Sequence, residues 1–182
     1  MSVQSVLTTS LVGGTISSLS ADLYFVNSSN HQFILNDAPK SVLNTTHPIK
    51  NIDISCGWIV DGVTITYQVA GTGGSSVLSH GSVFSPPSSS VAIGATEIVA
   101  AVFGRAGYQT YYEREMINNV GFVIFDTDKA TTRIAGPFGN GDNSNQGAPF
   151  YASDVLAFGS FAVPGSSALG LSGLFFYTDS AN

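Results

Sequence analysis

Short stretches in which apolar and polar residues alternate with a period of two recur along most of the chain. The clearest is 63–69, which alternates strictly and predicts a strand with one buried face and one exposed face. No stretch has the 3.6-residue apolar period of an amphipathic helix. The pattern therefore predicts an all-β protein.

Turn residues separate the predicted strands at intervals of roughly 8–12 residues, which is typical of a sandwich, a barrel or a prism. A strand is expected at 5–12, 22–26, 32–35, 49–56, 63–69, 91–93, 97–103, 120–125, 131–135, 155–161 and 169–177. The charged stretch 111–115 is either an edge strand or a solvated loop, and we favour the edge strand. Turns are expected at 71–76 and 164–167, and a polar loop at 140–147.

The stretch 57–62, Gly-Trp-Ile-Val-Asp-Gly, lies where the strand 49–56 gives way to the next one. It places the single tryptophan, Trp58, and a carboxylate, Asp61, at the rim of a sheet. Backbone N–H groups at a strand end and a carboxylate can together bind the hydroxyl groups of a sugar, and an aromatic face can pack on its C–H surface. The stretch is therefore a candidate sugar site.

A plainer interpretation exists for each of these residues. Asp61-Gly62 is a common hairpin-turn dipeptide, and Trp58 can be a half-buried packing residue. His80, beside Gly81, is either a ligand contact or a solvated loop histidine. The residues alone leave these alternatives open.

Composition excludes several classes of function. The chain has 182 residues, a formal net charge of −6 and only 10% charged residues, which disfavours binding to nucleic acid or electrostatic attachment to a membrane. Its single cysteine, Cys56, cannot form an intrachain disulfide. The three histidines show no metal-ligand spacing, and we expect neither a metal nor a cofactor. With no visible leader or membrane span, we expect a cytoplasmic protein, or one released without a classical leader.

From residue 49 onward, several pieces occur in the order in which the jacalin-related lectins carry them. These pieces are 49–54, 57–67, the glycine-rich turn 71–74, 91–93, 97–99, 120–122, the Ile-Ala-Gly-Pro-Phe-Gly run at 134–139, 147–150 and 155–158. On these residues the chain resembles a mannose-binding jacalin-related lectin of fungal type. The resemblance covers residues 49–178, and 1–48 are divergent.

The resemblance implies a fold, a function and an assembly. The fold would be a single domain, residues 1–182, forming a β-prism of three Greek-key antiparallel sheets with pseudo-threefold symmetry. The function would be binding of mannose- or glucose-type glycans, without catalysis. The partners would be mannose-containing glycans or glycoproteins, and a homo-oligomer would act as a haemagglutinin.

The resemblance also assigns site residues through the family's G-x-x-x-D motif. Gly57 would be the motif glycine, Trp58 and Ile59 the backbone donors, and Asp61 the carboxylate, with His80 and Gly81 in the facing loop. A second, degenerate site would use Gly13, Gly14, Gly165, Ser166 and Ser167. In that copy, Leu169 or Gly170 stands where the aspartate is expected.

Two other functions remain open. The missing C-terminal aspartate favours a prism that has lost sugar binding and serves as a protein-interaction or structural domain. A glycosidase would need two carboxylates at a defined separation, and Asp53 and Asp61 on adjoining strands are the available pair. The sequence contains neither a G-x-S-x-G elbow nor a P-loop, so we expect no enzyme.

Overall fold

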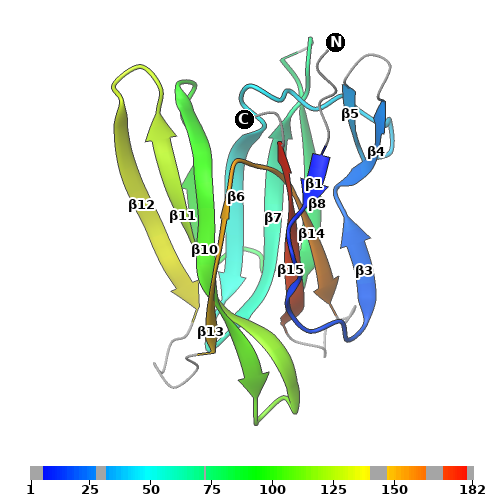
Figure 1. Ribbon diagram of the computed structural model, residues 1–182, viewed down its shortest axis with the longest axis vertical. Helices are drawn as coiled ribbons and strands as arrows, with labels where there is room; N and C mark the ends of the chain where they lie inside the picture. Colours follow the sequence, from blue (N-terminus) through cyan, green and yellow to red (C-terminus); the bar gives the residue numbers. More distant parts are fainter. Residues whose placement is uncertain (1–5, 28–31, 72, 140–146, 163–169, 180–182) are drawn as a thin grey trace.

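The computed structural model describes residues 6–27, 32–71, 73–139, 147–162 and 170–179. These residues contain no helix. They form fifteen strands, arranged as three antiparallel sheets and one separate two-stranded hairpin (Figure 1). The predicted all-β class is confirmed.

Two of the sheets are built from consecutive strands in the same order. The first contains β6 (Ile49–Cys56), β7 (Val60–Gln68), β8 (Ser75–Gly81) and β9 (Ser89–Ala92), in the order β8-β7-β6-β9. The second contains β10 (Glu97–Gln109), β11 (Arg114–Asp126), β12 (Thr131–Gly139) and β13 (Ala148–Ser153), in the order β12-β11-β10-β13. In each, the fourth strand returns beside the first, which is a Greek key.

The third sheet repeats this order with strands from both ends of the chain. Its central hairpin is β14 (Val155–Ala162) and β15 (Leu171–Asp179). On β15 lie β1 (Val6–Thr8) and β2 (Val12–Gly13), and on β14 lies β3 (Ser18–Ala21). The N-terminal strands thus complete a third Greek key around the C-terminal hairpin, as the predicted pseudo-threefold prism requires.

The separate hairpin, β4 (Leu23–Asn27) and β5 (Gln32–Leu35), lies between β3 and β6 in the chain. Its residues Phe33 and Leu35 are fully buried, and the nearby Leu43 forms an isolated bridge with Val69 after β7. This hairpin therefore packs onto the first sheet and lies outside the threefold pattern. It belongs to the part of the sequence where the family resemblance is faintest.

Six side chains at the same level of the three central hairpins form the middle of the core. Each hairpin contributes one directly opposed pair, and all six side chains are at most 1% exposed. The pairs are Ile52 with Ile65, Val102 with Phe122, and Phe158 with Phe176. The third sheet supplies two phenylalanines where the first supplies two isoleucines, so the three sheets fill the core unequally.

Each central hairpin also has a β-bulge at the same two levels. One level is close to the start of the first strand of the hairpin, and the other is close to the start of the second strand. At each level a single residue has no partner across the hairpin. The residues at the first level are Lys50, Ala100 and Leu156, and those at the second level are Asp61, Asn118 and Ser172. A bulge reverses the alternation of side chains, so that Val60 and Val63 both point into the core.

A glycine on the neighbouring strand lies against each bulge of the second level. Gly81, Gly139 and Gly13 have φ values of +70°, +92° and +80°. A Cβ on any of them would collide with the carbonyl oxygen of the bulged residue, Asp61, Asn118 or Ser172 respectively. These three glycines are therefore required both by their backbone conformation and by close approach.

Several strand predictions agree with the structure and several do not. The strands at 32–35 and 49–56 are confirmed with the predicted bounds. The pattern missed β8, which occupies Ser75–Gly81, because the sequence places 75 and 76 in the turn expected at 71–76. The edge strand favoured at 111–115 is wrong, and the alternative of a loop holds for 111–113, since residues 110–113 form the turn between β10 and β11. The pattern missed β3 and β13.

Gly81, which lies against the second-level bulge at Asp61, gives a direct test of this packing. We expect Gly81→Ala to lower the free energy of unfolding by about 2 kcal/mol or more, because alanine would adopt positive φ and collide with the Asp61 carbonyl. Gly57→Ala is the matched control, since a Cβ there would meet nothing within 4 Å. Urea denaturation of both variants is the measurement, and equal stability would contradict the proposed constraint.

Candidate functional site

The predicted motif forms the connection between β6 and β7, at the lower end of the prism in Figure 1. The Gly57 N–H donates to the Ile59 carbonyl oxygen, at 3.0 Å, which closes the connection into a tight turn. Ile59 is 1% exposed, whereas Trp58 is 55% exposed. The turn therefore projects its tryptophan outward while one side chain fixes it to the core.

Two glycines explain why Ile59 can be buried. A Cβ on Gly170 would collide with the Ile59 side chain, and a Cβ on Gly139 would touch its backbone. The first glycine precedes β15 and the second ends β12, so the turn sits against both other sheets. Its position is consequently set by the whole prism rather than by its own sequence.

Asp61 follows this turn as the bulged residue of β7. It is only 6% exposed, and burial raises the pKa of its carboxyl group to about 6. Among the described residues, no donor forms a hydrogen bond or an ion pair with this carboxylate. A desolvated carboxylate without a compensating partner is characteristic of a functional position.

Tyr112 belongs to this site, and the sequence pattern did not indicate it. It lies in the turn between β10 and β11, where burial raises the pKa of its hydroxyl group and the negative charge of Asp61 raises it further. Its ring packs edge-to-face against Tyr111, with the centroids 5.0 Å apart. Tyr111 is 79% exposed. The second sheet thus brings two aromatic rings to the end of the molecule where Asp61 lies.

The structure also brings the predicted facing segment to Asp61. Gly81 pairs with Gly62, and the Ser82 N–H donates to the Asp61 carbonyl oxygen at 2.9 Å. The loop that begins at Ser82 therefore starts directly beside the bulge. Gly57, Trp58, Ile59, Asp61 and Gly81 consequently lie together at one end of the first sheet.

His80 does not belong to this surface, and both of its sequence interpretations are wrong. It lies in β8 and is 1% exposed. One ring nitrogen contacts the Ser160 hydroxyl group at 2.8 Å, and the other contacts the Asp22 carboxylate at 2.9 Å. Its neighbours Ser79 and Gly81 suggested a loop, but the side chain points between the first and third sheets.

Asp22, His80 and Ser160 have the composition of a hydrolase triad, but their surroundings indicate a structural role. All three are at most 1% exposed, and the Tyr67 hydroxyl group donates to the same Asp22 oxygen. The Phe158 N–H in turn donates to the Tyr67 oxygen at 3.1 Å. The polar groups thus satisfy one another inside the core and tie the first sheet to the third.

The predicted second site is only partly described by the structure. Gly165, Ser166 and Ser167 lie outside the described residues. Gly13 pairs with Gly173, and the Gly14 N–H donates to the Ser172 carbonyl oxygen at 2.8 Å. Close packing on β15 therefore explains Gly13, whereas a Cβ on Gly14 would collide with the Glu115 side chain of β11.

The register also corrects the alignment of the C-terminal motif copy. The residue equivalent to Asp61 is the bulged Ser172, rather than Leu169 or Gly170. Its equivalent in the second sheet is Asn118, which accepts a hydrogen bond from Gln109 Nε2 at 2.8 Å. Both side chains are buried, and among the described residues the Ser172 hydroxyl group and the Asn118 amide nitrogen have no hydrogen-bond partner. Of the three equivalent positions, Asp61 alone supplies a charge.

The proposed glycosidase pair is not supported by the surroundings of Asp53. Its carboxylate accepts hydrogen bonds from Asn51 Nδ2 at 2.8 Å and from the Ser90 hydroxyl group at 2.6 Å. It is thus part of a polar ladder that joins β6 to β9.

The described residues contain no cluster of three or more His, Cys, Asp or Glu side chains placed to bind a metal ion. In the same part of the chain, no helix is long and apolar enough to cross a membrane.

Comparison with known proteins identifies the architecture. The sequence matches no family model and no curated protein. The structure is similar to that of Malaysian banana lectin, with a TM-score of 0.63 and 18% identity over 98% of this chain and 100% of that one. It is similar to a mannose-specific jacalin-related lectin from Morus nigra, with a TM-score of 0.65 and 16% identity over 96% and 94% of the two chains. A mannose-binding lectin from Champedak gives a TM-score of 0.64 and 15% identity over 99% of both chains.

The chain has the β-prism fold of the jacalin-related lectins. The sheet order and the threefold bulges described above are therefore features of a known architecture. At identities of 15–18%, the similarity extends to the fold and not to particular side chains. The chemistry of the site has to be argued from Asp61 and its surroundings.

The raised pKa of Asp61 has a measurable consequence for stability. Because the folded-state pKa of about 6 exceeds the ordinary value of 3.8, the folded protein binds this proton more tightly. Burial of the ionised carboxylate therefore destabilises the folded protein. This destabilisation is absent below pH 3.8, grows as the pH rises to about 6 and is complete above that pH. We expect Asp61→Asn to stabilise the protein at pH 8 by up to about 3 kcal/mol, and to have little effect near pH 4.

Urea denaturation of both proteins from pH 4 to pH 8 provides the measurement. Glu97 and Asp126 also make the stability depend on pH, because hydrogen bonding to Arg133 and to Lys129 lowers their pKa values to about 2. Only the difference in stability between the two proteins therefore isolates the contribution of Asp61. A variant less stable than the wild type at pH 8 would show that the carboxylate has a stabilising partner.

Proposed function

We propose that the protein is a non-catalytic lectin that binds a mannose- or glucose-type residue at the turn between β6 and β7. Asp61 would accept hydrogen bonds from two neighbouring sugar hydroxyl groups. The backbone of Trp58 and Ile59 would supply donors, and the exposed Trp58 ring would pack on the sugar or on the next residue of the glycan. Tyr111 and Tyr112 extend the aromatic surface toward the second sheet.

The observation that carries this proposal is the state of Asp61. Its carboxylate is buried, and it destabilises the protein when it is ionised. None of the described residues donates a hydrogen bond to it. It nevertheless lies next to the turn that carries the exposed Trp58. At neutral pH it is mostly ionised, because its pKa is about 6. Two sugar hydroxyl groups would restore the hydrogen bonds that burial removes, and bonds to an ionised acceptor belong to the stronger class.

The empty space around Gly57 also supports the proposal. A Cβ at this position would meet nothing within 4 Å, and the residue does not have positive φ. Neither packing nor backbone conformation therefore requires a glycine here. A glycine that the fold does not need is consistent with a ligand lying directly against the backbone.

Proteins with the same fold are known with sugars bound. The Morus nigra lectin was crystallised with mannose, and artocarpin, which has 15% identity and a TM-score of 0.64 to this chain, with mannotriose and with mannopentose. These ligands are properties of those proteins. They support the choice of mannose-type glycans as the first ligands to test on this one.

The proposal extends to the biology of the protein. We infer a single lectin domain over residues 1–182 from a fungal source, located in the cytoplasm or released without a classical leader. Self-association would place two or more sites on one assembly, which raises avidity without new contacts and would allow agglutination.

A second candidate function is a prism that binds a protein rather than a sugar. The observation in its favour is that two of the three equivalent bulge positions carry no charge, because Asn118 and Ser172 occupy them. Glycan binding by the wild-type protein would decide between the two functions.

A glycan array with the purified protein and with Asp61→Ala is the direct test of the lectin function. We expect the wild type to bind mannose-terminated glycans and the variant to lose at least tenfold in affinity, because a charge-assisted pair of hydrogen bonds is removed.

Asp128→Ala, at an exposed carboxylate in the turn after β11, is the matched control and should bind as the wild type does. Binding that survives in Asp61→Ala would move the site elsewhere. A blank array with a folded wild-type protein would leave the scaffold function.

Gly57→Ala separates binding from folding. We expect this variant to unfold within about 0.5 kcal/mol of the wild type, because its methyl group meets open space. It should nevertheless lose mannose affinity, since the methyl group would occupy the position of the ligand. Calorimetric titration with methyl mannoside measures this, and unchanged affinity would show that no ligand approaches Gly57.

A further inference from the structure

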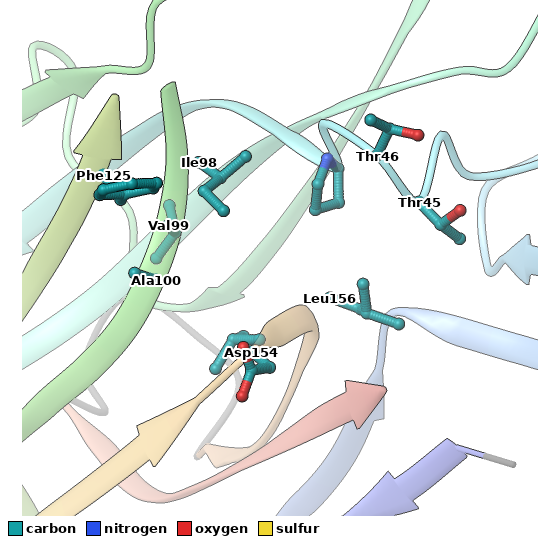
Figure 2. Close-up of a pocket in the computed structure, with 10 residues that line it drawn as sticks. Thr45, Thr46, Ile98, Val99, Ala100, Phe125, Asp154 and Leu156 are labelled. Atoms are coloured by element: carbon teal, nitrogen blue, oxygen red, sulfur yellow. The ribbon is translucent and has the colours of Figure 1, made fainter. Parts of the chain in front are cut away.

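A cavity of about 460 Å³ lies at the end of the prism opposite to Asp61. The strands β6, β10 and β14 run in the same direction in Figure 1, and the cavity forms where they begin, whereas Asp61 lies beyond the end of β6. Figure 2 shows the cavity between the first residues of β10 on one side and the segment before β6 on the other. Its wall includes Thr45, Pro48, Val99, Phe125, Asp154 and Leu156.

The first-level bulges explain why the cavity exists. Ala100 and Leu156 are the bulged residues of β10 and β14, and both line it. A bulge bends its strand and increases the local twist, which separates the strand starts at this end. Pro48, Ile98 and Asp154 occupy equivalent positions, two residues before the bulges at Lys50, Ala100 and Leu156, and all three contribute to the wall.

Local hydrogen bonds hold the polar part of the wall in place. The Asn44 side chain accepts from the N–H groups of Thr46 and His47, at 3.0 and 3.3 Å, which fixes the segment that carries the two threonines. Asp154 has a φ of +54°, and its N–H donates to the Ala100 carbonyl oxygen at 3.1 Å. The cavity is therefore formed before any ligand enters.

The lining is apolar inside and polar at the mouth. Pro48, Val99, Val155 and Leu156 are buried, whereas Thr45, Thr46 and Asp154 are exposed. Asp154 supplies the single charge of the lining, and no described residue donates a hydrogen bond or forms an ion pair with its carboxylate. The volume and this combination of an apolar body with a few polar groups are typical of small-molecule sites.

We propose that this cavity binds a small amphiphilic amine, with its apolar body against Val99, Phe125 and Leu156 and its ammonium group on the Asp154 carboxylate. An anion would face the carboxylate and the net charge of −6 without a compensating cation in the lining. A sugar would leave hydroxyl groups unpaired against the apolar wall, which is costly.

This inference does not depend on the proposed lectin function. The sugar site uses the turn after β6, and the cavity uses the strand starts at the other end of the molecule. The two sites share no residue, so each can be removed while the other is measured.

The test compares three probes of similar shape: 2-phenylethylamine, 2-phenylethanol and 3-phenylpropionate. Calorimetric titration of the full chain should show saturable 1:1 binding of the amine, with a dissociation constant of about 1 mM or tighter. The alcohol should bind at least about tenfold more weakly, and the anion not at all. Amide chemical shifts should move at 98–100 and 154–156, and not at 57–61.

Two variants locate the amine. Asp154→Asn removes the charge while keeping a residue type that tolerates positive φ, and should weaken amine binding about tenfold without changing alcohol binding. Ile98→Trp should fill the cavity and abolish the binding of both probes. Asp128→Asn is the charge-matched control, and all three variants should retain the glycan binding of the wild type.

Three results would overturn the proposal. These are the absence of saturable amine binding, amine affinity unchanged in Asp154→Asn, and shift changes that cluster at the turn between β6 and β7. If Ile98→Trp does not fold, the comparison of amine and alcohol in Asp154→Asn decides alone. A protein that binds amine and no glycan would overturn the lectin function and leave the cavity site standing.

Discussion

Three close contacts between a glycine and a carbonyl group set the geometry of the end of the prism that carries Asp61. Gly13, Gly81 and Gly139 each adopt positive φ and each lie against the carbonyl oxygen of a bulged residue. Because glycine has no side chain, the neighbouring strand can approach the bulge closely. This close approach holds the bulge in place. The bulge in turn decides which way the following side chain points. The position of Asp61, and with it the whole site, depends on a contact in which Asp61 takes part only through its backbone.

The same scaffold holds three different polar groups at three equivalent positions. Asp61 is ionisable, Asn118 is hydrogen-bonded to Gln109, and Ser172 is completely buried. The fold therefore tolerates a polar group at each bulge, and the choice of residue determines what that end of a sheet can bind. The network of Asp22, Tyr67 and His80 shows the opposite use of buried polarity. There, every polar group has a partner inside the protein, and the result is a joint between two sheets.

Period-two patterning predicts strands well wherever a strand is regular and fails wherever a bulge interrupts it. The strand 49–56 and the inward face of 63–69 follow from alternation and from the turn residues around them. Val60 and Val63 both face the core although three positions separate them, because the bulge at Asp61 inserts an extra residue. The same effect explains why the sequence did not identify Ser172 as the equivalent of Asp61. Only the pairing of β14 with β15 shows that Ser172 is the bulged residue. Tyr112 was missed because the charged residues around it are equally compatible with an edge strand, and its proximity to Asp61 arises from packing between sheets.

The third sheet is assembled from segments more than 130 residues apart in the chain. Its central hairpin, β14 and β15, is synthesised last, while β1, β2 and β3 are synthesised first. During synthesis the first two sheets can close as soon as their own strands have left the ribosome, but the N-terminal strands must wait with open edges. Pairings of such large sequence separation form slowly and expose strand edges to other chains in the meantime. We therefore expect folding to begin in the middle of the chain, and the joining of the two ends to be the step most exposed to aggregation.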